Sequence, residues 1–222
     1  YDEAQALYEE LGLHWERAAV FGALGKMEHA LGNFAASMRQ YRASLDLFRK
    51  LGDHRQASVV LSDLAGVLRY ADQIGEALQI SQDAVEIARR LGNRALLAQS
   101  LAGLGFSLHM VGDFEEALAA LSESLALAQD LGSIDHLITA LIHLSVLTAD
   151  LGRYDEARAH AERALMLSGP AHRAYVGGMS LFQLSNIALA TGNYKEAKRL
   201  AEEGAAIFDD SQPRTEHSYL LI

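Results

Sequence analysis

Val111-Gly112-Asp113-Phe114-Glu115-Glu116-Ala117-Leu118 recurs in shorter versions along the whole chain. Each version has a glycine, a polar residue and an aromatic ring, and they are spaced by forty residues or a multiple of forty; the other copies are Gly32-Asn33-Phe34, Gly152-Arg153-Tyr154 and Gly192-Asn193-Tyr194. A Leu-Gly pair keeps the same step, as at Leu51-Gly52 and Leu91-Gly92. A fixed period of about twenty to fifty residues is typical of stacked repeats. We therefore predict an array of repeated units.

Each unit is predicted to contain two helices. After Asp53, apolar residues follow the three-and-four spacing of one helix face. Asp53 and Gln56 form a capping pattern at the start of this helix, and Gly92 is suited to the left-handed conformation that ends the next one. The fold class predicted is therefore all-α, with antiparallel helical hairpins because the connections are short. For the second and third units we expect helices at 54–71, 76–90, 94–111 and 114–131.

Two departures from the repeat affect these expectations. Asp72 stands where other units have the turn glycine, and Asp tolerates the left-handed conformation less well. We expect this turn to be longer or looser. In the fourth unit, Ser168-Gly169-Pro170 replaces the Leu-Gly pair, so its second helix is expected to stop early.

The domain organisation is predicted as one array over residues 1–222. Both ends fall inside a repeat, so we expect the chain to be a fragment of a longer protein. The expected units are a partial repeat at 1–12, repeats at 13–52, 53–92, 93–132, 133–170 and 171–211, and a partial repeat at 212–222.

Composition restricts the partners. The formal net charge of −10 argues against direct binding of nucleic acid, which needs clustered Lys and Arg, and it gives a weak preference for basic partners. The chain has no cysteine, and its longest apolar run, 137–149, is too short to span a bilayer. No phosphate-binding loop, nucleophile elbow or zinc-protease motif occurs. His136 and His143 lack neighbouring carboxylates, so a metal site is not expected. We expect a cytoplasmic protein that is not an enzyme and has no cofactor.

The units resemble the tetratricopeptide repeat (TPR) family over nearly the whole chain. The resemblance rests on an apolar pair and a small residue in the first helix, then the glycine–aromatic turn and a small residue in the second helix. In the third unit these are Leu101, Leu104, Gly105, Gly112-Asp113-Phe114 and Ala117. The family resemblance implies a right-handed α-α superhelix of about five hairpins. The forty-residue period is similar to the sensor region of MalT/LuxR-type bacterial signal-transduction ATPases, to kinesin light chains, and to adaptors that link G proteins to the spindle.

Binding is the function that the resemblance implies, because first helices of the family line a concave surface that holds ligands. At those positions the residues vary between units, while the packing positions do not. The interpretation is a module that binds a protein or peptide segment, as the sensor or scaffold part of a larger regulatory protein. The candidate ligand-binding residues are Lys26, Asp63, Arg69, Tyr70, Phe106, His109, Met110, His143, Gln183 and Asn186.

Two alternatives stay open at this point. The array could be a structural spacer or a self-association surface, or it could be the small-molecule sensor of a transcriptional activator. The apolar members of the variable positions, among them Phe106, Met110 and Phe182, are compatible either with packing between repeats or with a groove for a partner.

Overall fold

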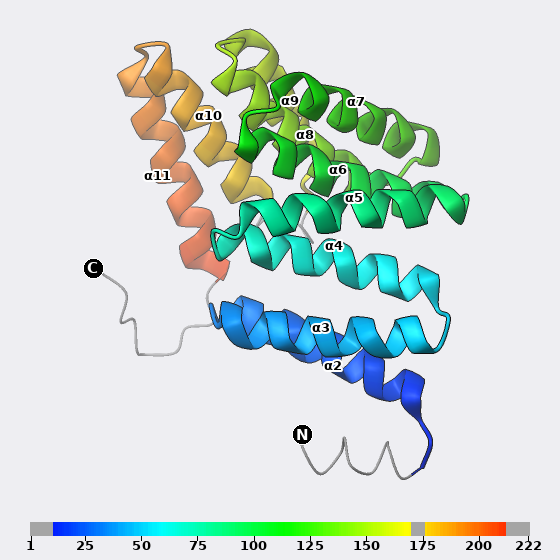
Figure 1. The fold of residues 1–222 in the computed structure, drawn as a ribbon. Helices are drawn as coiled ribbons and strands as arrows, with labels where there is room; N and C mark the ends of the chain where they lie inside the picture. The colour runs from blue at the N-terminus through cyan, green and yellow to red at the C-terminus, as the bar shows by residue number, and fades with distance from the viewer. Residues whose placement is uncertain (1–10, 170–175, 212–222) are drawn as a thin grey trace. The chain divides into compact units, whose positions relative to one another are not determined.

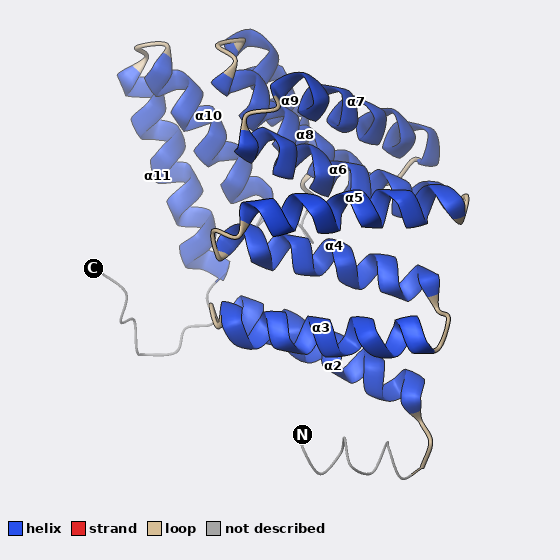
Figure 2. Cartoon of the chain, viewed as in Figure 1, coloured by secondary structure: helices blue, strands red, loops and turns tan. Residues whose placement is uncertain are grey.

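The computed structural model describes residues 11–169 and 176–211, and within them the chain forms ten helices and no strand (Figures 1 and 2). The prediction of an all-α fold of about five helical hairpins is confirmed. The helices are α2 (His14–Ala30), α3 (Phe34–Lys50), α4 (His54–Tyr70), α5 (Ile74–Arg90), α6 (Arg94–Val111), α7 (Phe114–Leu131), α8 (Ile134–Asp150), α9 (Tyr154–Leu167), α10 (Gly178–Ala190) and α11 (Tyr194–Ser211).

The chain divides into two compact units. Unit 1 (Tyr1–Leu131) contains α2 to α7, and unit 2 (Gly132–Ile222) contains α8 to α11. Each first helix packs against the second helix that follows it, and neighbouring hairpins also pack together within a unit, as α3 does against α4 and α5 against α6. The organisation into one array with the repeat bounds given above stays a prediction. No helix in the described residues is both long and apolar enough to cross a membrane.

Glycine turns end the first helices as expected. Gly112 follows α6 in the left-handed region, with φ of 89°. Its N–H donates to the carbonyl of His109 (3.1 Å), and the N–H of Asp113 donates to that of Leu108 (3.0 Å). These bonds satisfy carbonyl groups that would otherwise be unpaired at the helix end. The chain then reverses into α7 at Phe114.

The turn at Asp72 does not differ in length, so the expectation of a longer or looser turn is wrong. Asp72 itself adopts the left-handed conformation, with φ of 59°. Its N–H donates to the carbonyl of Arg69 (3.2 Å), and the N–H of Gln73 donates to the carbonyl of Leu68 (2.9 Å). The same two bonds are formed at Gly112. The next helix begins at Ile74, two residues earlier than predicted. Asp can occupy this region at an energetic cost, and packing of the hairpin holds it there.

The other helix ends lie close to those predicted. The Asp53 carboxylate accepts the N–H of Gln56 (3.0 Å), which confirms the expected cap. In unit 2, α9 has 14 residues whereas α3 and α5 have 17, so the predicted early stop near Ser168 is also confirmed.

Small residues bring the two helices of a hairpin together. A Cβ atom added at Gly25 would lie 2.8 Å from Cδ1 of the buried Tyr41, so only glycine fits there without a shift of the ring. Forty residues on, where Ala65 replaces this glycine, the tyrosine is replaced by Ser81. The two positions are therefore matched in size from one hairpin to the next.

Buried serines also hold the helices together, although the sequence gives them no evident role. The hydroxyl of Ser37 donates to the carbonyl of Gly25 (2.7 Å), between α3 and α2. Ser44 and Ser124 bridge the helices of their own hairpins by bonds to the carbonyls of Ala18 (2.8 Å) and Ala98 (2.7 Å). A buried hydroxyl needs such a partner, because leaving it unpaired costs free energy.

Candidate binding surface on the first helices

An aromatic cluster forms where α2, α3 and α4 meet in unit 1. The rings of Phe34 and Tyr70 are stacked, with centroids 5.9 Å apart and planes inclined by 14°. The His29 ring lies 5.1 Å from that of Tyr70 and 5.9 Å from that of Phe34. Tyr70 is nonetheless 63% exposed. The cluster therefore holds Tyr70 in place and leaves much of its surface open to a partner.

Arg69, the neighbour of Tyr70, connects α4 to α6. Its guanidinium lies over the Phe106 ring, 5.3 Å from the centroid, and donates to the hydroxyl of Ser107 (3.1 Å) and the carbonyl of Gly103 (3.4 Å). Burial lowers the pKa of Arg69 to about 10. The side chain is still charged at neutral pH, so the cation–π contact holds the Phe106 ring against α4.

The contacts continue from Phe106 within the α6–α7 hairpin. The Phe106 and His109 rings are 6.1 Å apart, and the His109 and Phe114 rings are 5.9 Å apart. A row of contacting side chains, continuous through the chain itself between Arg69 and Tyr70, therefore crosses the three described hairpins of unit 1. We call it the aromatic row; its members are His29, Phe34, Arg69, Tyr70, Phe106, His109 and Phe114.

An ion pair between Lys26 and Asp63 also joins α2 to α4. Lys26 Nζ lies 3.3 Å from Asp63 Oδ2, and the Asp63 side chain is only 23% exposed. Burial raises the pKa of the Asp63 carboxyl, and Lys26 opposes this rise. Burial, together with the charge of Asp63, raises the pKa of Tyr41 above its usual range. Lys26, whose side chain is 65% exposed, is the outer member of this group.

Two glycines beside Arg69, Gly66 on α4 and Gly103 on α6, leave the helix backbone uncovered by side chains. A Cβ atom at Gly103 would meet nothing within 4 Å, and one at Gly66 would lie 3.7 Å from Nη2 of Arg69. Both glycines are half-buried. A ligand can therefore approach the backbone of α4 and α6 closely at this place, which residues with larger side chains would prevent.

The predicted site residues of unit 2 form a separate set. Gln183 on α10 donates to the carbonyl of Ser145 on α8 at 3.5 Å, so its amide helps to pack these helices. His143 is half-buried on α8, and Asn186 is exposed on α10. Their role in binding stays a prediction.

In unit 1 the structure brings several predicted site residues together. Arg69, Tyr70, Phe106 and His109 belong to the aromatic row, and Met110, the next residue on α6, is 43% exposed. Lys26 and Asp63 pair with each other. Sequence reasoning missed Phe34 and Phe114, whereas His29 stands at one of the variable first-helix positions. The two phenylalanines occupy the aromatic position of the turn pattern, which by itself marks only the turn.

A cavity of about 500 Å³ lies elsewhere in unit 1, at the opposite ends of the hairpins. Its volume falls in the range of small-molecule sites, roughly 300–1,000 Å³. None of its lining residues is among those predicted; they are Arg49, His54, Ala57, Asp83, Glu86, Ile87, Arg90 and Leu91. Among the described residues, no group of three or more His, Asp or Glu side chains is arranged to hold a metal ion.

Comparison with known proteins gives a family and a set of similar folds. A family model described as "Tetratricopeptide repeat" matches residues 16–90 and 96–168. No curated protein sequence matches the chain.

Three solved structures illustrate the similarity of fold. A Rap protein complexed with Competence and Sporulation Factor has a TM-score of 0.78 at 20% identity, over 89% of this chain and 56% of that one. The Rap conjugation gene regulator of plasmid pLS20, in complex with the Phr* peptide, has a TM-score of 0.72 at 18% identity, over 86% and 53%. A signal-transduction ATPase with numerous domains from Pyrococcus horikoshii, which has a tetratricopeptide repeat sensor, has a TM-score of 0.65 at 19% identity. Alignment with the ATPase covers 89% of this chain and 31% of that one.

Proposed function

The chain belongs to the tetratricopeptide repeat family, and on that premise we propose that the aromatic row of unit 1 binds a peptide or a protein segment. The observation that carries this proposal is the exposure of Tyr70 and Met110 beside rings that are held in place. Tyr70 is fixed by stacking on Phe34, so little conformational freedom is left to lose on binding. Ordered aromatic side chains of this kind are enriched among the residues that dominate binding energy.

The arrangement favours an elongated ligand. The row crosses from α2 and α3 through α4 to α6 and α7, and glycines 66 and 103 lie next to Arg69. An extended or helical segment can contact several hairpins at once, with apolar anchors on the rings and its backbone near the glycines. A small compact molecule would reach only one part of the row.

The similar structures support a role in regulation. Both Rap structures were solved with a bound factor or peptide, and the ATPase uses its repeats as a sensor. This chain spans about half of each Rap protein and about a third of the ATPase. We propose that it is the sensor or scaffold part of a larger cytoplasmic regulatory protein, and that it binds rather than catalyses.

One observation favours a second function. The 500 Å³ cavity is lined by the apolar side chains of Ala57, Ile87 and Leu91 together with charged side chains, as small-molecule sites often are. A sensor of a small metabolite would use this cavity and leave the aromatic row free. The two proposed functions differ in where the ligand binds, at the aromatic row or in the cavity. No comparable observation favours a role as a spacer or self-association array.

Selection from a random peptide library on the immobilised chain tests the proposal. We expect selected peptides to lose at least about tenfold in affinity for Tyr70→Ala and Met110→Ala. Leu51→Ala is the matched control, because Leu51 is 42% exposed at the opposite end of the hairpin. Selected peptides that bind both sets of variants equally would contradict the proposal.

A further inference from the structure

Unpaired carboxylates lie next to two members of the aromatic row along the chain. Asp72 follows Tyr70 by two residues, and Asp113, Glu115 and Glu116 flank Phe114. All four side chains are exposed, and in the part of the chain that the structure describes none of them forms an ion pair. The end of unit 1 that presents the row is therefore acidic.

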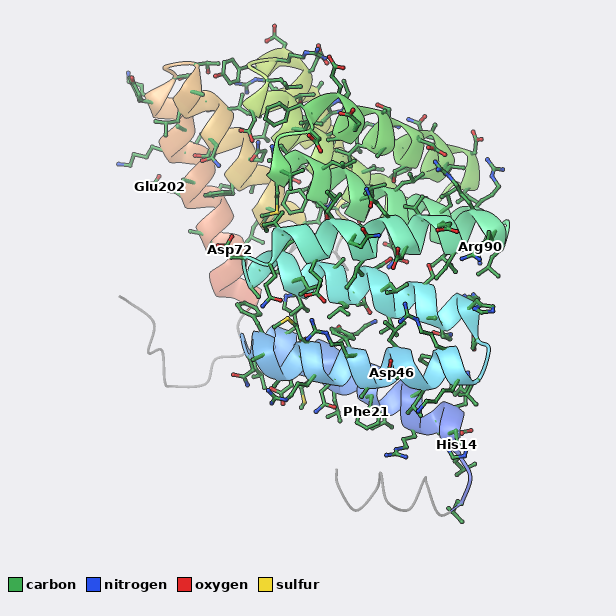
Figure 3. The ribbon with its side chains drawn as sticks, in the orientation of Figure 1. His14, Phe21, Asp46, Asp72, Arg90 and Glu202 are labelled. Atoms are coloured by element: carbon green, nitrogen blue, oxygen red, sulfur yellow. The ribbon has the colours of Figure 1, made fainter. Side chains whose placement is uncertain are left out.

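Two cations beside the row, Lys26 and Arg69, are already engaged by other groups. Lys26 is paired with Asp63, and Arg69 is enclosed by Phe106, Ser107 and the Gly103 carbonyl. Exposed cations gather instead at the opposite ends of the same hairpins. Figure 3 shows Asp72 at one end of α4 and α5 and Arg90 at the other. The cations at that opposite end are Arg49, Lys50, Arg55, Arg89, Arg90 and Arg94, of which the last three pair with Glu123, Glu86 and Asp130.

Charge and exposed apolar surface together specify the occupant of the row. We infer that it is a basic segment, with aliphatic or aromatic side chains on Tyr70 and Met110 and Lys or Arg side chains beside the four carboxylates. This inference rests on the proposed function and adds the chemistry of the partner. An acidic segment would place like charges together, which lowers both affinity and association rate.

Salt gives this pairing a measurable signature. The carboxylates are exposed, and at physiological ionic strength charges separated by more than about 8 Å are largely screened. Affinity for a basic segment should therefore fall as salt is added. The apolar contacts to Tyr70 and Met110 do not weaken in this way.

Three synthetic peptides of equal length test the inference by fluorescence anisotropy. The first is a Lys-rich amphipathic peptide with Leu and Trp anchors. The second has Glu in place of every Lys, and the third keeps Lys but has Ser in place of the anchors. We expect only the first to bind at micromolar concentration, about tenfold more weakly when the salt is raised from 50 to about 300 mM.

Substitutions then test whether the carboxylates beside the aromatic row bind the Lys-rich peptide. The triple substitution Asp72→Asn, Glu115→Gln and Glu116→Gln should weaken binding of the Lys-rich peptide by at least about tenfold. A control triple substitutes exposed acidic residues elsewhere, Glu16→Gln, Asp46→Asn and Asp155→Asn, and changes the net charge equally. The affinity of this control for the Lys-rich peptide should stay within about twofold of that of the unchanged chain. Equal losses in both triples would show only a response to net charge and would overturn the inference.

The experiments distinguish failure of this inference from failure of the proposed function. If the acidic peptide binds as well as the basic one, and both need Tyr70, the proposed function stands and the partner is not selected by charge. If the Lys-rich peptide does not bind, the inference is wrong. The random-library selection then decides separately whether the row binds any peptide.

Discussion

The Leu121 side chain lies so close to Gly105 that a Cβ atom at residue 105 would be 2.5 Å from Leu121 Cγ. The two residues stand sixteen apart on α6 and α7, as Gly25 and Tyr41 do on α2 and α3. Glycine at this position lets a large side chain of the second helix pack directly on the backbone of the first. The pairing fixes how closely the two helices that present His109 and Phe114 approach each other.

Gly105→Ala should therefore lower the free energy of unfolding by up to about 2 kcal/mol, because overpacking costs about 1–3 kcal/mol and the helix preference of Ala over Gly offsets about 1 kcal/mol of it. Gly103→Ala is the matched control on the same helix, where a Cβ atom meets nothing within 4 Å. This substitution should raise the free energy of unfolding by up to about 1 kcal/mol. Urea denaturation measures both, and equal effects would contradict the packing described.

Asp72→Gly should stabilise the chain by about 1 kcal/mol, because a left-handed φ costs an L-residue roughly 1–2 kcal/mol and Gly almost nothing. The reverse change at the equivalent turn, Gly112→Asp, should destabilise by a similar amount. Thermal unfolding of the two variants provides the measurement. A loss of stability in Asp72→Gly would mean that the Asp side chain makes a contribution beyond its backbone conformation.

A double-mutant cycle tests the contact between Arg69 and Phe106. Single and double substitutions to Ala should give a coupling energy of about 0.5–2 kcal/mol, as expected for a partly desolvated cation–π pair. A control cycle pairs Phe106 with Arg89, which instead lies 3.0 Å from Glu123. That cycle should give a coupling below about 0.5 kcal/mol. Similar coupling in both cycles would contradict a direct contact.

Removal of the Lys26 charge by Lys26→Met should raise the pKa of Asp63 further, because Lys26 opposes the rise that burial causes. Since the folded-state pKa lies above that of the unfolded chain, Asp63 favours folding at low pH. This contribution is lost as the pH rises through the folded-state pKa. Carbon-13 NMR titration of the Asp63 carboxyl measures the change, with Lys50→Met as the control that leaves it unaltered.

Much of the fold follows from the sequence because each forty-residue unit repeats the same packing requirements. Helix ends such as those of α6 are marked by local signals, a cap at Asn93 and a glycine at Gly112. The Asp72 turn was predicted wrongly because intrinsic preference for the left-handed region is a small energy, and hairpin packing outweighs it.

The aromatic row was predicted only in part. Its contacts between hairpins join residues 36 to 41 positions apart, such as Phe34 with Tyr70 and His29 with Tyr70, and these depend on how neighbouring hairpins pack. Variation at the first-helix positions pointed to Arg69, Tyr70 and Phe106. No comparable signal marked Phe34 or Phe114 as neighbours of those residues.

NMR chemical-shift mapping with a peptide selected from the library shows directly where a ligand binds on unit 1. We expect the largest changes in and next to the aromatic row, at Tyr70, Phe106, Met110 and Phe114, and little change at the residues that line the 500 Å³ cavity. Changes centred on Arg49, His54 and Ile87 would contradict this expectation and would assign binding to that cavity instead.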